Sequence, residues 1–341
     1  MGGTRPCRRG YCGSTRHPAR TIGPFDQPRR RMMSTVNDMA EMPVQLALNP
    51  VTAAEKRSRY FNSGNAFNIK LPPVPGKIFT DEPAKALEME ATGFINCDLS
   101  DQMQCAFPAT TPLMLARYAV VKAGETLNAT LVNTASIWYM ISGKAELSVG
   151  DEVASIGKTD VFLLPGGVPT AITASEDSLF WAVGNDPQLK FDTSVPVTGE
   201  GAAVQFVHYP AAEIVHQLDV VYGSNANAST SGHALIFSAE KTEAARNITP
   251  TMTLSLNTLK PRSAQPPHKH NSAAITLVVA GEPAYSMVAE EKCDWSPWAT
   301  LVTPAAAKHS HHNDGDTRAE FLIVQDGGFY YHARTMGFEF Y

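Results

Sequence analysis

The stretch of sequence that decides the fold is His268–Gly281, which reads HKHNSAAITLVVAG. It joins a His-x-His pair to an apolar run of the β-strand type. Successive side chains of a strand point to opposite faces, so His268 and His270 share one face and Lys269 lies on the other. If the shared face lines the interior of a barrel, the two imidazoles converge on one point.

A third histidine follows in Pro304–Asn313, which reads PAAAKHSHHN. His309 lies five residues after Pro304, where another strand can supply it. Neutral imidazole is the commonest protein ligand for transition metals, and three imidazoles leave coordination positions open, as catalytic sites do. We therefore predict a metal centre formed by His268, His270 and His309.

Histidine enrichment favours this interpretation over two simpler ones. A histidine on an apolar strand is commonly a hydrogen-bonded core residue, and a His-x-His pair after Pro266 and Pro267 can belong to a surface loop. However, six of the ten histidines lie in the last 74 residues: His268, His270, His309, His311, His312 and His332. We therefore favour a metal site over isolated core or surface positions.

The chain contains an internal repeat. Thr130–Gly143 (TLVNTASIWYMISG) aligns without a gap on His268–Gly281, 138 residues further on (130 against 268). Each copy is followed by a short strand-like run and then by a second run that ends in proline, at Pro165 and Pro304. A period this long indicates a duplicated domain, because solenoid repeats run from about 20 to 50 residues.

Short β-type runs separated by glycine and proline surround both copies. They are Leu115–Val121, Ile137–Ser142, Lys144–Val149, Asp160–Leu164, Met252–Leu259, Ala274–Val279, Tyr285–Val288, Thr300–Thr303 and Ala319–Val324. This rhythm predicts an all-β fold of the sandwich or barrel type. Between the two groups, Pro210–Tyr222 has apolar residues at helical spacing and is predicted to be a connecting helix.

These runs predict a domain order. An arm at residues 34–104 precedes a first barrel at 105–200, a connecting segment at 201–232 and a second barrel at 233–341. The part of the arm from Ala53 to Gln104 is expected to pack against the first barrel.

Composition bears on location and partners. Residues 1–33 hold eight arginines and one acidic residue, Asp26, which suits either an organelle transit peptide or a disordered tail ahead of a translation start at Met32 or Met33. A net charge of -5 and the lack of an apolar run of about 20 residues argue against nucleic-acid and membrane partners. Five scattered cysteines favour a reducing compartment. We expect a cytoplasmic protein, or a mitochondrial one if the leader is a transit peptide.

The two histidine segments resemble the two halves of the cupin signature. The first half is the His-x-His pair with Gly281 downstream, and the second is Pro304-x4-His309-x3-Asn313. Ala274 stands where that signature usually has a glutamate. This replacement, together with the run HSHHN that begins at His309, is similar to the gentisate 1,2-dioxygenase group of bicupins.

The resemblance covers Pro266–Gly315 and implies two tandem cupin barrels (double-stranded β-helices) with a short helical connection. It also implies a three-histidine Fe(II) site that cleaves an aromatic ring with O2, an extradiol-type dioxygenase activity on a hydroxylated aromatic acid. By analogy, the chain is expected to form a homo-oligomer. The ligand types alone are equally compatible with Zn, Mn or Ni.

One feature departs from that group, whose metal histidines lie in the first barrel and not in the second. In this chain the corresponding first-barrel positions are Thr130, Val132 and Thr170. None of them replaces an imidazole, and Val132 has no donor atom. We therefore predict a metal-free first barrel with a structural role, as an interface or a lid.

Three further residues are candidates for the site. Strand parity places Thr276 on the ligand face, where we predict that it contacts substrate. His311 is a candidate for hydrogen bonding or proton transfer, although a position at the strand end in contact with water is an equal alternative. Arg262 is predicted to bind a substrate carboxylate, with Arg318 and Arg334 as competitors.

Two other functions compete with a dioxygenase. The same metal centre with Zn, Mn or Ni would serve a non-redox lyase, isomerase or hydrolase acting on a small carboxylate. A non-catalytic bicupin that binds a metal or another ligand belongs to a different class altogether. Because one fold hosts many functions, fold alone does not decide among them.

Overall fold

The computed structural model describes residues 38–224 and 233–341. The predicted leader and the last eight residues of the predicted connecting segment, 225–232, lie outside this part of the chain. The chain divides into two compact units, and the boundary between them in the sequence falls between Lys70 and Leu71. The described elements of the first unit are η1 (Met39–Glu41), β1 (Gln45–Leu46), α1 (Ala53–Lys56) and β2 (Arg59–Tyr60).

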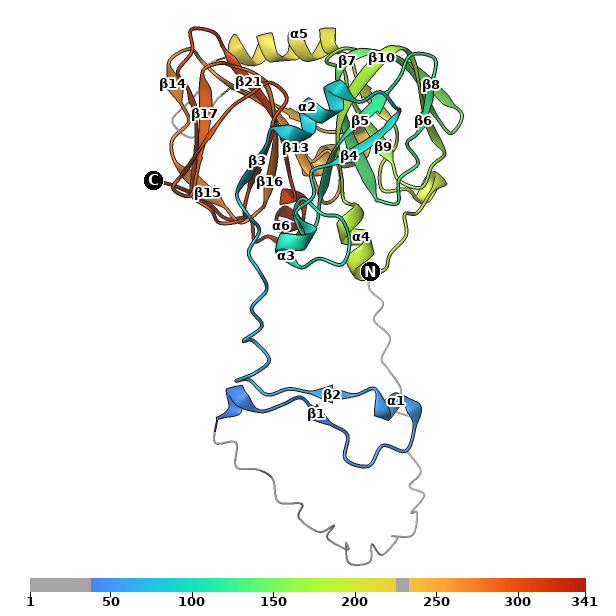
Figure 1. Cartoon of the computed structure of the whole chain (residues 1–341), viewed down its shortest axis with the longest axis vertical. Coiled ribbons are helices and arrows are strands. Elements are labelled where there is room, and N and C mark those ends of the chain that lie inside the picture. The colour runs from blue at the N-terminus through green and yellow to red at the C-terminus, as the bar shows by residue number, and fades with distance from the viewer. Residues whose placement is uncertain (1–37, 225–232) are drawn as a thin grey trace, which may run out of the picture. The chain divides into compact units, whose positions relative to one another are not determined.

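The first barrel is an eight-stranded antiparallel sheet, drawn mostly in green in Figure 1. Its strands are β4 (Gly93–Asn96), β5 (Leu115–Val121), β6 (Thr126–Asn128), β7 (Ala135–Val149), β8 (Glu152–Gly157), β9 (Val161–Pro165), β10 (Thr170–Gly184) and β11 (Val207–Tyr209). The order is β11-β9-β7-β10-β5-β4, with β6 paired to β10 and β8 to β7. Side chains along β5 are buried on both faces, so this strand reads as a continuous apolar run.

The second barrel consists of two six-stranded sheets, orange to red in Figure 1 except for β3. The first sheet has the order β12-β13-β21-β16-β19-β3, and the second has the order β18-β17-β20-β15-β22, with β14 paired to β20. Their strands are β3 (Lys77–Phe79), β12 (Ala234–Phe237), β13 (Thr253–Leu259), β14 (Ser263–Ala264), β15 (His268–His270), β16 (Ala274–Ala280), β17 (Ala284–Val288), β18 (Glu291–Asp294), β19 (Thr300–Thr303), β20 (His309–Asn313), β21 (Ala319–Gln325) and β22 (Phe338–Phe340).

The two barrels repeat the same order of strands, as the internal repeat predicts. A shift of 138 residues places β5 on β13 and β9 on β19. The same shift places the long strand β10 on β20 and β21 together. The all-β fold of two tandem barrels is therefore confirmed.

The predicted connecting helix is α5 (Ala211–Tyr222), which runs across the top of both barrels in Figure 1. It buries Ile214 and Leu218, which are four residues apart and share one helix face. The other α-helices of the second unit are α2 (Asp81–Glu88), α3 (Ser100–Met103), α4 (Asp186–Asp192) and α6 (Gly327–Ala333). In the part of the chain that the structure describes, no helix has the length and apolar character needed to cross a bilayer.

The predicted packing of the arm is wrong in part. β4 does extend the first barrel, because it pairs with β5. However, β3 pairs with β19 and so adds an edge strand to the second barrel instead. Phe79 on β3 is only 1% exposed, and burial of this ring in the shared core explains why the strand lies there.

The first sheet of the second barrel has two different faces. Ile275 and Leu322 belong to a hydrophobic core that also contains Trp181 of the first barrel. The Trp181 indole donates a hydrogen bond to Thr300 Oγ1 on β19 at 2.9 Å, which joins the barrels by a polar contact as well. Alternate residues such as Thr276 face the interior of the second barrel. The sheet therefore serves as both the barrel interface and a cavity wall.

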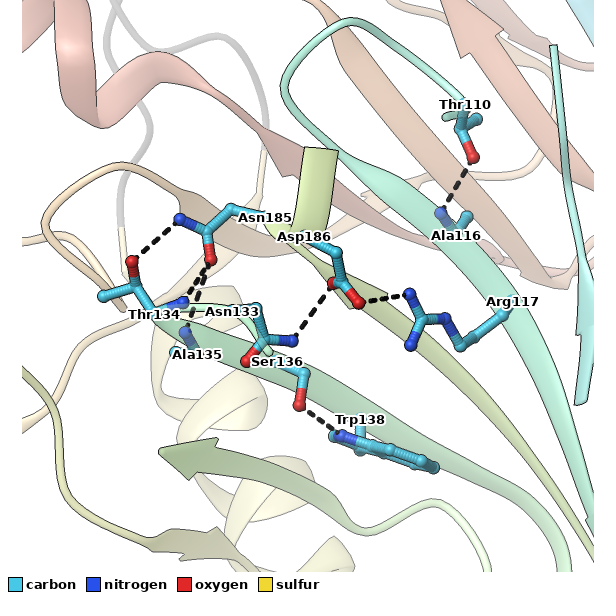
Figure 2. A network of polar contacts seen from close by, with 10 residues as sticks. All are labelled: Thr110, Ala116, Arg117, Asn133, Thr134, Ala135, Ser136, Trp138, Asn185 and Asp186. Atoms are coloured by element: carbon cyan, nitrogen blue, oxygen red, sulfur yellow. Dashed lines mark hydrogen bonds and ion pairs between the residues drawn. The ribbon is translucent and has the colours of Figure 1, made fainter. Parts of the chain in front are cut away.

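A buried polar network connects three segments of the first barrel (Figure 2). Arg117 on β5 forms an ion pair of 2.8 Å with Asp186 at the start of α4, and Asn133 donates to the other carboxylate oxygen at 3.1 Å. The neighbouring Asn185 accepts the backbone N–H of Thr134 at 2.8 Å. These bonds fix the chain before β7 against β5 and α4.

Candidate metal centre

The structure brings His268, His270 and His309 together. The first two lie on the short strand β15 and the third begins β20, where His268 and His309 are direct cross-strand partners. One nitrogen of each imidazole lies within 4.8 Å of a nitrogen of the other two. Among the described residues, these three form the one group of three or more histidine, cysteine or acidic side chains whose spacing suits a metal ion.

Hydrogen bonds fix the orientation of all three rings. Each Nδ1 faces a backbone carbonyl oxygen: His268 with Pro266 at 2.9 Å, His270 with Ser272 at 2.8 Å and His309 with Ala307 at 2.9 Å. Because a carbonyl only accepts, each Nδ1 carries the hydrogen and each Nε2 carries the lone pair. Metal-binding histidines are oriented by outer bonds of this kind, so the three rings fit a divalent transition-metal ion bound through Nε2.

The electrostatic environment keeps these imidazoles neutral. Burial is the largest cause that lowers the pKa of His268 and of His270 below 6.5. The pKa of His309 is lowered to about 3 by burial first and by the charges of the other two rings second. Metal ligation requires the unprotonated ring, so the site is ready to bind an ion at neutral pH.

The three histidines lie at the wall of a cavity of about 550 Å³. This volume falls within the range of small-molecule sites. Polar side chains from β13, β16 and β21 line the wall formed by the first sheet: Ser255, Asn257, Thr276 and Gln325. The centre is therefore accessible to a small polar ligand.

Thr276 lies in this wall, on the face that strand parity predicts. The residue is 1% exposed, and its Oγ1 has no hydrogen-bond partner in the described part of the chain. Ala274, two residues earlier on β16, also lines the cavity and leaves room beside the histidines. A buried hydroxyl without a partner costs about 1–3 kcal/mol, so Thr276 is a position at which a ligand atom would complete a bond.

His311 is fully buried within the barrel instead of lying in water at a strand end. Its Nδ1 is 2.7 Å from Ser286 Oγ, which accepts a bond from the Trp295 indole at 2.8 Å. Burial lowers the pKa of His311 well below its usual value, with the His309 charge as the next cause. His311 also lines the metal cavity, so it faces the centre as a neutral ring.

The structure places Arg262 outside the cavity. Its guanidinium forms an ion pair with Asp316 at 2.8 Å, and both side chains are largely exposed. Arg318 is paired with Glu320, and Arg334 donates to the backbone of His332. The prediction that Arg262 binds a substrate carboxylate therefore gains no support from the structure, because the ion pair with Asp316 holds its side chain at the surface.

Sequence reasoning missed two features of the site. Gln325 on β21 lines the cavity, and its amide nitrogen lies 3.3 Å from His270 Nε2. An ion at the centre would displace this contact, so Gln325 is placed beside it. The C-terminal strand β22 pairs with β15, and Phe338 lines the cavity. A signal existed for β22, because Phe338 and Phe340 alternate with other residues at strand spacing.

The first barrel has no equivalent set of imidazoles at the matching place. Thr130 and Thr170 do meet there, since the Thr170 N–H donates to Thr130 Oγ1 at 2.9 Å. Val132 is 55% exposed, and its side chain has no donor atom. The counterparts of the three histidines are thus two hydroxyls and an exposed alkyl side chain.

Comparisons with known proteins agree with this architecture. Residues 255–325 match the family model of the Cupin domain. Over 73 residues the chain is 36% identical to gentisate 1,2-dioxygenase from Ralstonia sp, a match that covers 21% of each chain. The match therefore spans about a fifth of the length of that curated relative.

Similarity to solved structures extends over both barrels. Salicylate 1,2-dioxygenase from Pseudaminobacter salicylatoxidans superposes with a TM-score of 0.67 at 10% identity, over 82% of this chain and 92% of that one. A structure of salicylate 1,2-dioxygenase adducts with gentisate, from Pseudoaminobacter salicylatoxidans, gives a TM-score of 0.66 at 12% identity, over 81% and 87% of the two chains. At such identities the likeness concerns the fold.

The second barrel is thus a cupin domain, and the described chain from Leu71 onward has a two-barrel cupin fold. More particularly, the chain is similar over 73 residues to a gentisate 1,2-dioxygenase, and its fold is similar to that of a salicylate 1,2-dioxygenase.

Proposed function

We propose that this protein is a dioxygenase that cleaves the ring of a hydroxylated aromatic acid, with Fe(II) held by His268, His270 and His309. The histidine triad carries this proposal, because it offers three neutral imidazoles, each fixed through Nδ1, at the wall of a cavity suited to a small ligand. The local similarity to a gentisate 1,2-dioxygenase and the fold shared with a salicylate 1,2-dioxygenase support it.

When bound, Fe(II) supplies open coordination positions and redox chemistry with O2. Neutral ligands cancel none of the charge of a divalent ion, so the centre favours anionic, oxygen-rich substrates. The absence of acidic side chains among the cavity-lining residues that the structure describes favours the same substrates.

Thr276 is the residue that we expect to orient the substrate. Its buried Oγ1 is unpartnered among the described residues, and Thr276 lines the same cavity as the metal ligands. A hydroxyl both donates and accepts, so it can bind a substrate hydroxyl or a carboxylate oxygen. Its rigid β-branched side chain, buried in a strand, limits the positions that the bonded atom can take.

His311 is the residue that we expect to hold a proton next to the reacting groups. The Trp295 indole donates to Ser286 Oγ, which leaves the Ser286 hydroxyl hydrogen free for His311 Nδ1. His311 then carries its own hydrogen on Nε2. Since burial keeps the ring neutral, His311 acts as a hydrogen-bond donor instead of an imidazolium acid.

An oxygen-electrode assay on the Fe(II)-reconstituted protein tests this function. Gentisate, salicylate and related hydroxy acids serve as substrates, and iron content is measured on the same sample. We expect one O2 consumed per substrate, with new ultraviolet absorbance from a ring-opened acid, because both oxygen atoms enter the product and no external reductant is needed. The protein loaded with Zn(II) is the control and should consume no oxygen. Turnover of a hydroxy acid by either form without oxygen uptake would instead identify a non-redox enzyme.

A further inference from the structure

Arg246 is the one lysine, arginine or acidic side chain among the described residues that line the metal cavity. No sequence motif marks Arg246 as a candidate site residue, since it lies outside the two histidine segments. Its position in the cavity wall raises the question of which group it binds.

The backbone around Arg246 is held in a defined conformation. Arg246 ends the 3-10 helix η3 (Glu240–Ala245), where its N–H donates to the Glu243 carbonyl at 3.0 Å and its φ is +54°. The next residue, Asn247, is buried, and its carbonyl accepts a bond from Ser238 Oγ at 3.0 Å. These bonds therefore fix the position of the Arg246 backbone beside the cavity.

The guanidinium of Arg246 has no hydrogen-bond or ion-pair partner in the part of the chain that the structure describes. Arg246 is exposed, as Arg262 is, but Asp316 pairs with the Arg262 guanidinium at 2.8 Å, whereas Arg246 lines the metal cavity without such a partner among the described residues. A guanidinium presents five donors in a planar fork that matches a carboxylate. Arg246 is thus a cation whose matching anion the described residues do not supply.

A second hollow makes the approach to Arg246 basic. It has a volume of about 680 Å³ and shares Ala245, Asn247 and Tyr331 with the metal cavity. Its basic lining residues are Lys241, His332 and Arg334, and among the described residues neither aspartate nor glutamate lines it. An anion that approaches through this hollow meets only positive or neutral side chains before it reaches the cavity.

We propose that Arg246 binds the carboxylate of the aromatic acid and so selects acids over uncharged phenols. This proposal rests on the proposed function for the nature of the ligand, although binding itself does not require turnover. It assigns to Arg246 the role that sequence analysis gave to Arg262.

Ligand binding to the Zn(II)-loaded protein tests the proposal without oxygen chemistry. Salicylate and catechol are the probes, since each has two adjacent oxygen groups but only salicylate is an acid. Arg246→Ala should weaken salicylate binding by roughly tenfold to a hundredfold, as expected when a bond to a charged group is lost. Catechol binding should change by less than about twofold, and Arg246→Lys should restore part of the salicylate affinity.

Arg262→Ala is the matched control and should leave both affinities unchanged, because Arg262 lies outside the cavity. Zinc content and the thermal midpoint of each variant are measured on the same samples. Equal salicylate affinity in Arg246→Ala and the wild type would overturn the proposal, and so would an equal loss of salicylate and catechol binding.

Oxygen uptake separates failure of this proposal from failure of the proposed function. If salicylate binding depends on Arg246 but no hydroxy acid supports oxygen uptake with Fe(II), the dioxygenase assignment fails and carboxylate binding by Arg246 is supported. If a hydroxy acid is cleaved and Arg246→Ala leaves its KM unchanged, carboxylate binding by Arg246 is refuted and the dioxygenase assignment is supported.

Discussion

The ring of Phe338 stacks on the imidazole of His268, with ring centroids 5.0 Å apart and planes 19° from parallel. Phe338 begins β22, which pairs with β15 so that His268 faces Phe340 and His270 faces Phe338. On its other side, β15 pairs with β20 only at His268 and His309. The last strand of the sequence therefore supplies most of the backbone pairing of the strand that carries two predicted metal ligands.

Phe338→Ala should weaken metal binding by about tenfold, because changes in the groups that orient metal ligands typically cost 10- to 100-fold in affinity. Deletion of residues 338–341 should weaken it further, since β15 then loses its β22 partner. The measurement is the Zn(II) dissociation constant from competition with a chelator. Glu339→Gln is the control, because the exposed ion pair of Glu339 with Lys269 contributes little. Wild-type affinity in the shortened chain would contradict this role of β22.

His270→Ala should abolish metal binding, since it removes one of three donors and leaves a two-histidine site. Thr170→Val changes the first-barrel counterpart of His309 and should leave metal content unchanged. Metal analysis after dialysis against a weak chelator distinguishes the two variants. Full metal occupancy in His270→Ala would show that the ligand set is wrong, and metal loss in Thr170→Val would point to a second centre in the first barrel.

Thr276→Val should separate function from stability, because valine has nearly the shape of threonine without its hydroxyl. The Oγ1 atom has no protein partner in the described residues, so its removal should leave the free energy of unfolding unchanged or raise it by about 1 kcal/mol. The KM for the aromatic acid should rise by roughly tenfold if the hydroxyl binds substrate. Urea unfolding and steady-state oxygen uptake measure the two effects. A destabilised variant with an unchanged KM would place the hydroxyl in a structural role.

Local periodicity was sufficient to predict much of this fold. Parity along β15 and β16 correctly placed the histidine pair and Thr276 in the barrel interior, where they line one cavity from two sheets, since side chains of a strand alternate whatever its partners are. The alignment of Thr130–Gly143 with His268–Gly281 correctly predicted a duplicated barrel for a similar reason: equal strand spacing in the sequence gives equal strand order.

Contacts between distant segments could not be predicted in this way. Arg262 lies close to the histidines in sequence, yet Asp316 holds it at the surface, whereas Arg246 reaches the cavity from a turn after η3. The pairing of β3 with β19 and of β22 with β15 joins segments that are far apart in the sequence. No local sequence pattern indicates that these segments pair. Such pairings depend on the assembled sheets, which offer an unpaired edge only once the barrel has formed.

The metal-free protein should lose stability as the pH falls below about 6.5. Burial lowers the pKa of His268, His270 and His309 in the folded state, the last to about 3, while an unfolded histidine titrates near 6.5. Between these values the unfolded chain binds more protons than the folded chain, so acid favours unfolding. Each unit by which a pKa is lowered corresponds to about 1.4 kcal/mol at most.

Asp326 has the opposite effect, because burial raises its pKa from 3.8 to about 7. Between these values the folded state binds more protons, so this carboxyl lowers stability as the pH rises. Urea unfolding of the metal-free Asp326→Asn variant from pH 8 to pH 4.5 therefore measures the histidine effect without this opposing carboxyl, and His311, whose pKa burial also lowers, contributes in the same direction. A free energy of unfolding that stays constant over that range would contradict the neutral, buried state of the imidazoles.

The ion pair between Arg117 and Asp186 should be costly to break. The two side chains are 6% and 11% exposed, so Asp186→Ala leaves a buried guanidinium without its counter-ion (Figure 2). Removal of one partner of a buried pair costs about 3–5 kcal/mol, whereas replacement of both by apolar residues is often nearly neutral. Arg117→Met combined with Asp186→Leu should therefore be more stable than Asp186→Ala alone, as measured by urea unfolding. Zn(II) affinity should be unchanged in both variants, because the network lies within the first barrel. A loss below about 1 kcal/mol in Asp186→Ala would mean that water reaches Arg117 and solvates it.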